Sequence, residues 1–184
     1  MRVFVPALLG LFAVSLAVAQ NTPPANPYST FNKAAYSRMQ DTIVRAAEKM
    51  PEENYNFKPV DSVRTFGQIV GHIADAQYMF CSIATGEKNP SLNIEKTKTT
   101  KADLVAALKE SVAYCTKAYD SMNDETGAQL VNLFGQMKAP RLGVLTVNLM
   151  HDDEHYGNLV TYMRIKNIVP PSSEQQAAPA PPKK

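Results

Sequence analysis

The sequence predicts an all-α protein whose four long amphipathic helices form one bundle. Three observations predict it. Apolar residues recur at spacings of three and four in four segments, and few runs alternate with a period of two. The prolines of the central region fall between these segments, where a helix must stop, at Pro51, Pro59, Pro90 and Pro140. Four such helices in one domain of this length most simply form a four-helix bundle.

Residues 1–19 predict a secretory signal peptide. One basic residue, Arg2, precedes an apolar stretch that ends in Ala17-Val18-Ala19, the small-residue pattern of a cleavage site. The stretch is interrupted by Pro6 and Gly10 and followed by polar residues, which favours a cleaved signal over a membrane span, and no cysteine stands at the cleavage point to carry a lipid. We therefore expect a secreted or periplasmic protein without a stable membrane anchor, in which residues 20–27 form a disordered linker.

The four helices follow in order within a domain at residues 28–169. The first is predicted from Ser29 to Lys49. The second begins at a capping box, Thr65 to Gln68, and ends at Gly86. The third begins at a similar cap, Thr100 to Asp103, and the fourth starts after Pro140 and runs to about Lys166.

Two regions give weaker signals. Residues 126–139 are too mixed to place and are read as a short helix or a loop over one end of the bundle. Residues 170–184 are rich in proline and alanine, so we expect a disordered tail.

The charge is nearly balanced. The chain has 19 basic and 17 acidic residues, and removal of Arg2 with the signal leaves 18 basic residues. Nucleic-acid-binding proteins usually carry a basic excess or patch, which is not visible here, so we expect no nucleic acid partner. We expect a small-molecule substrate, and whether the protein forms a homodimer is left open.

Three histidines form the sharpest pattern. His151 and His155 are four residues apart on the fourth helix and therefore project from one face. His72 lies between Ile69 and Ala76 on the buried side of the second helix. The three imidazoles can meet inside the bundle, as in catalytic zinc sites that leave a fourth position for water.

A simpler interpretation stands beside this one. A single histidine on an apolar stripe is usually a hydrogen-bonded core residue, and a His-x-x-x-His pair is common on helices. Glu154 precedes the second histidine rather than following the first, so the zincin pattern is absent. The joint placement of all three histidines on inward faces is what favours a metal site.

Three segments resemble a known family. They are Gly67-Gln68-Ile69-Val70-Gly71-His72-Ile73-Ala74, the run from His151 to Arg164, and Ile168-Val169-Pro170-Pro171. Together they are similar to the DinB-like superfamily of DinB/YfiT-like metal-dependent enzymes. The resemblance implies an up-down-down-up four-helix bundle with a long crossover between helices two and three. It also implies that His72, His151 and His155 hold a divalent metal ion, zinc or nickel.

The sequence offers candidates for a general base. A three-histidine site can lower the pKa of bound water toward ~7, and Asp75, Asp152 and Glu154 are near the expected ligands. Asp75 is better explained as a carboxylate that orients a ligand or is solvated. Asp152 and Glu154 are better explained, with Asp153, as a solvated acidic face. The catalytic residues therefore stay unassigned.

Two tyrosines are candidates to close the pocket. Tyr156 and Tyr162 lie on the fourth helix near the histidines, although helical tyrosines more often belong to the core.

Three functions follow from these features. The first is an exported metal-dependent hydrolase. The second is a non-enzymatic metal-binding or stress-related bundle. The third is a thiol-dependent transferase, against which export counts because low-molecular-weight thiol cofactors belong mainly to the cytosol.

Whether Cys81 and Cys115 can form a disulfide depends on the relative directions of the second and third helices. If the second and third helices ran antiparallel, the thiols would lie about 15–20 Å apart along the axis. In parallel helices their heights match, near the separation that a disulfide needs. The up-down-down-up arrangement thus predicts a Cys81–Cys115 bridge; two buried free thiols are the alternative.

Overall fold

The computed structural model describes residues 25–174. The predicted signal peptide, most of the linker and residues 175–184 of the tail lie outside this range. The described chain is mostly helical, and its four long helices are α1 (Pro27–Lys49), α2 (Phe66–Thr85), α4 (Lys101–Asp120) and α6 (Arg141–Ile165). No helix in residues 25–174 is both long and apolar enough to span a membrane.

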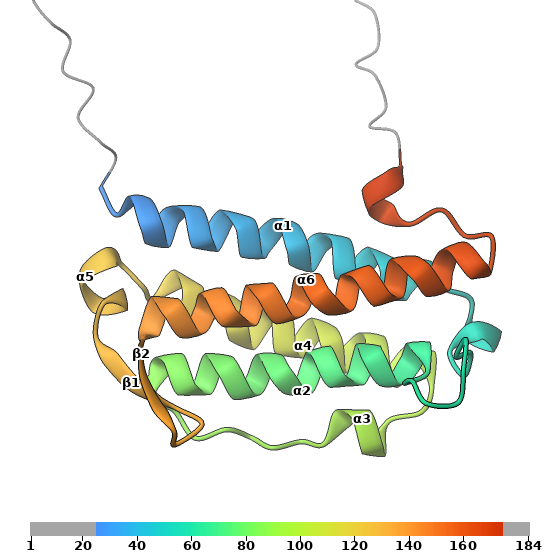
Figure 1. Cartoon of the computed structure of the whole chain (residues 1–184), viewed down its shortest axis with the longest axis horizontal. Coiled ribbons are helices and arrows are strands. Elements are labelled where there is room, and N and C mark those ends of the chain that lie inside the picture. Colours follow the sequence, from blue (N-terminus) through green and yellow to red (C-terminus); the bar gives the residue numbers. More distant parts are fainter. Residues whose placement is uncertain (1–24, 175–184) are drawn as a thin grey trace, which may run out of the picture.

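The long helices pack side by side around a common core. Helix α2 packs against α4 and α6, and α1 packs against the same two helices. In Figure 1, α1 and α6 run in one direction and α2 and α4 in the other. The predicted disulfide is confirmed: Cys81 of α2 and Cys115 of α4 are bridged, with Cα atoms 5.4 Å apart.

Local sequence signals account for the ends of these helices. The capping box at the start of α2 is complete, because Gln68 N donates to Thr65 Oγ1 and Thr65 N donates to the Gln68 side chain. Gly86 ends α2 in the left-handed conformation at φ 82°. Thr100 caps α4 by accepting from the Asp103 amide, and Pro140 precedes α6.

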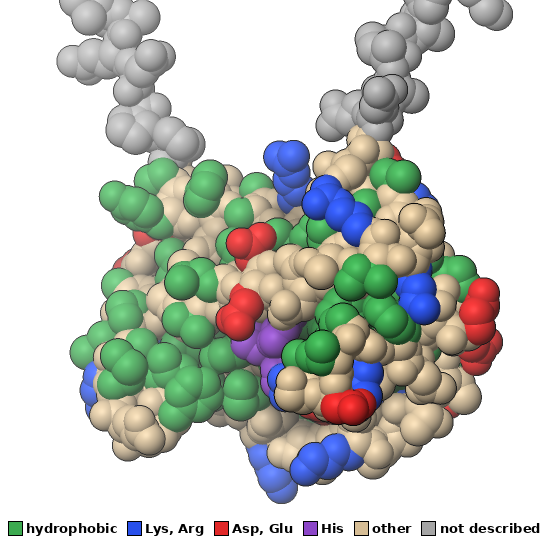
Figure 2. All heavy atoms as spheres, turned by 45° about the vertical axis from the view of Figure 1, so that its right-hand side comes forward, with side chains coloured by type: hydrophobic (Ala, Val, Ile, Leu, Met, Phe, Trp, Pro, Cys, Tyr) green, Lys and Arg blue, Asp and Glu red, His purple; other side chains and the backbone are tan. Residues whose placement is uncertain are grey.

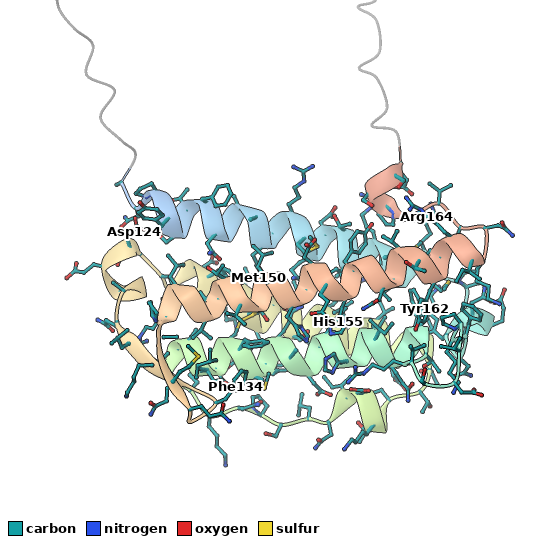
Figure 3. All side chains as sticks on the ribbon, in the orientation of Figure 1. Asp124, Phe134, Met150, His155, Tyr162 and Arg164 are labelled. Carbon is teal, nitrogen blue, oxygen red and sulfur yellow. A yellow bond between two sulfur atoms is a disulfide. The ribbon has the colours of Figure 1, made fainter. Side chains whose placement is uncertain are left out.

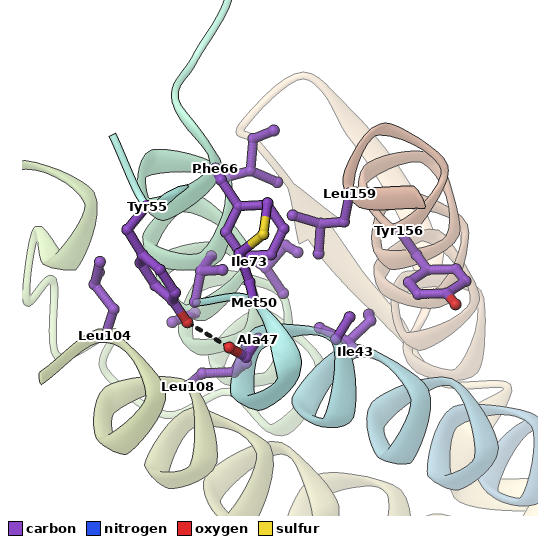
Figure 4. Close-up of a cluster of buried hydrophobic side chains, with 14 of the residues drawn as sticks. Ile43, Ala47, Met50, Tyr55, Phe66, Ile73, Leu104, Leu108, Tyr156 and Leu159 are labelled. Atoms are coloured by element: carbon purple, nitrogen blue, oxygen red, sulfur yellow. Dashed lines mark hydrogen bonds between the residues drawn. The ribbon is translucent and has the colours of Figure 1, made fainter. Parts of the chain in front are cut away.

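The interior contains large apolar side chains from all four long helices, some of which are drawn in Figure 4. Tyr55, in the loop after α1, is also buried there and donates from its hydroxyl to the Ala47 carbonyl at 2.6 Å. The core therefore extends under the loop between α1 and α2, and the Tyr55 carbonyl accepts from the Gly67 amide in the first turn of α2 at 2.8 Å.

The sequence prediction of an all-α chain was wrong in one region. Residues 126–139 include the end of a short helix, α5 (Asp124–Gly127), and an antiparallel hairpin of β1 (Leu130–Leu133) and β2 (Met137–Pro140). The turn places Phe134 and Gly135 at φ 54° and 70°. Two successive positive φ values are typical of tight hairpin turns, but phenylalanine is not a residue that signals them.

The crossover between α2 and α4 contains a further short helix, α3 (Ile94–Thr97), that packs on α2. Another short turn, η2 (Pro171–Ser173), follows α6. We expected disorder from Pro170 onward, and this was wrong for residues 170–174. Arg45 and Lys49 of α1 both form ion pairs with Glu174, which holds the segment on the helices.

Candidate metal centre

The three histidines converge. His72 of α2 and His151 of α6 place their Nε2 atoms 3.1 Å apart, and the Nε2 atoms of His151 and His155 are also 3.1 Å apart. One ring nitrogen from each residue lies within 4.8 Å of the others. Three nitrogens around a tetrahedral zinc ion would be separated by about 3.3 Å, so this spacing fits a divalent ion.

The cluster lies at the seam between α2 and α6 rather than fully inside the helices. The His72 side chain is 26% exposed, whereas His155 is buried. Figure 2 shows the histidines reaching the surface beside a broad hydrophobic area. The expectation of a fully internal site is therefore corrected, because His72 is at the edge of the buried face of α2. A ligand can approach from solvent.

Burial and neighbouring positive charge favour the neutral forms of His151 and His155. Burial lowers the pKa of His151 to about 4, with the neighbouring His155 and His72 contributing in the same direction. Burial also lowers the pKa of His155. Neutral imidazole is the form that binds a metal, so the lowered pKa values of His151 and His155 favour metal binding at neutral pH.

A carboxylate missed by the sequence analysis holds His72. Glu95 Oε2 lies 3.1 Å from His72 Nδ1, and Glu95 Oε1 accepts from Arg64 Nε at 2.9 Å. A proton on Nδ1 leaves Nε2 free to coordinate, and such carboxylate–histidine pairs orient metal ligands. Glu95 therefore selects the ring nitrogen that faces the other two histidines.

Asp75 and Gly71 explain how Glu95 reaches this place. The Asp75 carboxylate accepts from the backbone amides of Ile94 and Glu95, at 2.8 and 3.0 Å, so it caps α3 rather than facing the ligands. A Cβ on Gly71 would be 2.7 Å from Glu95 Cα, so α3 can approach α2 only because residue 71 is glycine. The Gly71-His72 pair was a sequence signal for this contact, although it did not identify Glu95.

Asp152 is not part of a solvated face, and that expectation was wrong. It is fully buried and accepts from Gln40 Nε2 at 2.7 Å and Asn148 Nδ2 at 3.3 Å. Burial raises its pKa well above the usual range. Asp153 and Glu154 are exposed, as expected. Neither Asp75 nor Asp152 is thus free to act as the general base.

The two candidate tyrosines point to different places. Tyr156 donates to Ser172 and lines a groove of about 1100 Å³ between α1 and α6, which contains none of the three histidines. Tyr162 donates from its hydroxyl to the Arg64 carbonyl at 2.8 Å and thereby supports the loop beside the site. Of the two tyrosines, only Tyr162 is hydrogen-bonded to a residue beside the metal centre, Arg64.

Comparisons with known proteins show the family and the fold. Residues 35–159 match the DinB superfamily. The chain belongs to the DinB superfamily. It is 26% identical over 122 residues to the uncharacterized protein YjoA of Bacillus subtilis (strain 168), which covers 64% of this chain and 77% of YjoA.

Solved structures show the same fold. A DinB-like protein from Bacillus cereus ATCC 10987 superposes with a TM-score of 0.67 at 14% identity, covering 76% of this chain and 93% of that one. A mycothiol-dependent maleylpyruvate isomerase superposes with a TM-score of 0.58 at 15% identity. This superposition covers 72% of this chain and 59% of the isomerase.

Proposed function

We propose that this DinB-superfamily chain is an exported protein that binds a divalent metal ion through His72, His151 and His155 and acts as a metal-dependent hydrolase. One observation supports it above the others: three Nε2 atoms from two helices meet at spacings suited to a single ion. Imidazole donors suit zinc and nickel. Such an ion supplies a Lewis acid that polarises a substrate or activates water.

The ligand set favours a catalytic over a structural ion. Within residues 25–174, the group of side chains that converges on the site has three members, all histidines. Structural zinc sites usually have four protein ligands, whereas catalytic sites have three. A non-enzymatic metal-binding bundle is therefore the less favoured function.

Export and topology belong to the same proposal. Residues 1–19 support a signal peptide, and the Cys81–Cys115 bridge suits an oxidising compartment. We take the long helices as an up-down-down-up bundle whose crossover runs from Gly86 to Thr100; the helix directions in Figure 1 support this.

Elemental analysis of the purified protein tests the metal site. After growth with zinc and nickel, we expect about one equivalent of metal in the wild type and a large loss in His151→Ala. Glu154→Gln, which changes an exposed charge beside His155, should retain the metal. Lack of stoichiometric metal in both wild type and His151→Ala would refute the metal site.

An activity screen then tests the reaction class. Metal-loaded protein should hydrolyse a member of a panel of esters, amides and lactones, and His151→Ala should not. Thiol-dependent transfer is the second candidate, supported by the fold shared with the mycothiol-dependent isomerase. Turnover that requires an added thiol would favour that candidate over hydrolysis.

A further inference from the structure

The metal centre is flanked by two chemically different surfaces. In Figure 3, Phe134 and Tyr162 lie on opposite sides of His155 along the long axis of the molecule. Tyr162 contacts the loop that carries Arg64, whereas Phe134 is at the tip of the β hairpin. A molecule bound over the histidines would therefore meet a cation at one end and an aromatic surface at the other.

Arg64 is fixed in place and still has hydrogen-bonding capacity. Its carbonyl accepts from Tyr162, its Nε donates to Glu95, and its Nη2 lies 3.4 Å from His72 Nδ1. Its side chain is 43% exposed, and Nη1 has no acceptor among the described residues. A guanidinium held in this way presents N–H donors beside the site, and guanidinium donors suit carboxylates.

The position of Arg64 is electrostatically costly for a metal site. The guanidinium of Arg64 lies 3.4 Å from the His72 ring, so its positive charge opposes further positive charge among the ligands. Glu95 offsets part of the charge of Arg64. An anionic ligand would offset the rest, because it would interact favourably with both Arg64 and a bound divalent ion.

The opposite flank is an aromatic surface. The Phe80 ring centroid lies 5.7 Å from that of His151, and the Phe134 ring centroid lies 5.8 Å from that of Phe80. Phe80 is buried, but Phe134 is 54% exposed. Met137, on the second strand of the hairpin, is 58% exposed. The hairpin thus presents Phe134 and Met137 to solvent, and the ring of Phe134 continues the aromatic surface that begins with Phe80 beside His151.

We propose that the three-histidine centre binds a small organic acid, with its carboxylate beside Arg64 and its apolar body on Phe80 and Phe134. This inference rests on the proposed metal site and specifies its ligand class. It predicts two separable contributions to binding. Arg64 contributes for every carboxylate, whereas Phe134 contributes only for those with an apolar body.

Cobalt-substituted protein provides the test, because the visible absorption of Co²⁺ changes when a ligand enters an open coordination position. Acetate and 3-phenylpropionate are titrated into the Co²⁺-loaded full chain. We expect 3-phenylpropionate to bind about tenfold more tightly than acetate, from the apolar area that its ring buries. Phe134→Ala should remove most of this difference, since Phe134 is the exposed member of the aromatic pair, and should leave acetate binding unchanged.

Arg64 is tested with two substitutions. Arg64→Gln should weaken both carboxylates about tenfold, the expected loss of a charge-assisted hydrogen bond, and Arg64→Lys should restore part of the affinity. Met150→Ala removes an exposed apolar side chain next to His151 in sequence that lines the α1–α6 groove. It should change neither titration.

The outcomes separate this inference from the proposed function. Absence of Co²⁺ binding by the wild type would contradict the metal site itself. Normal Co²⁺ binding with equal affinities for acetate and 3-phenylpropionate would overturn the ligand class alone. Arg64→Gln that weakens Co²⁺ binding but not carboxylate binding would also overturn it, because Arg64 would then act only on Glu95 and His72.

Discussion

Replacement of Glu95 by alanine should weaken metal binding without removing a ligand. Glu95 is 22% exposed and its carboxylate lies 3.1 Å from His72 Nδ1. Loss of a carboxylate that orients a metal-binding histidine typically costs 10–100-fold in affinity, or about 1.4–2.7 kcal/mol. We expect the upper half of that range, because Arg64 would lose its ion-pair partner and remain beside His72.

Zinc titration of the metal-free protein against a chromophoric chelator measures the effect. Glu95→Gln keeps an acceptor for the Nδ1 proton but removes the charge, so it should lose less affinity than Glu95→Ala. Glu154→Gln is the matched control, since it removes an exposed carboxylate near the same site. A loss below threefold in Glu95→Ala, or an equal loss in Glu154→Gln, would refute the role of Glu95.

Gly71→Ala tests the same role while retaining every charge. The added Cβ would lie 2.7 Å from Glu95 Cα and 3.0 Å from its amide nitrogen, so α3 must move away from α2. Zinc affinity should fall, and far-ultraviolet circular dichroism should show that the long helices remain. Unchanged zinc affinity would mean that the contact between α3 and α2 does not position the carboxylate.

Three further predictions concern stability. Replacement of Cys81 and Cys115 by serine should lower the free energy of unfolding by about 3–4 kcal/mol, from the 34-residue separation, as measured by urea denaturation. In metal-free protein the melting temperature should fall as pH decreases from 6.5 toward 4, because the unfolded state protonates His151 before the folded state does; His151→Asn should reduce this fall. The pKa of Asp152 is raised in the folded state. This carboxyl therefore lowers the free energy of unfolding increasingly as pH rises above 3.8, its ordinary pKa. Asp152→Asn should therefore melt at a higher temperature than the wild type at pH 7, with a smaller difference at pH 4.

The long helices could be predicted because their signals are local. Thr65 and Gln68 satisfy the first amides of α2 within four residues, and Gly86 ends it through its own backbone conformation. The hairpin could not be predicted in this way, because its turn places Phe134 at a positive φ, and phenylalanine is not a residue type that indicates such a turn.

The ligands of the candidate site could be predicted, but the residues that support them could not. His151 and His155 are one helical turn apart, so their shared face follows from helix geometry. Glu95 is 23 residues from His72 and reaches it through the crossover, a path that no periodicity describes. Asp152 was misplaced because its neighbours are acidic, whereas its hydrogen-bond partner Gln40 is 112 residues away.

One turn of α2 organises the His72 side of the centre. Gly71 admits α3, His72 supplies the ligand, and Asp75 fixes the α3 amides that place Glu95. The orientation of His72 thus depends on the docking of a four-residue helix that is too short to be stable alone. Because metal binding and α3 docking favour the same imidazole orientation, each should stabilise the other. Metal should therefore slow amide exchange at Ile94 and Glu95, and Asp75→Asn should reduce that protection while leaving the three ligands in place.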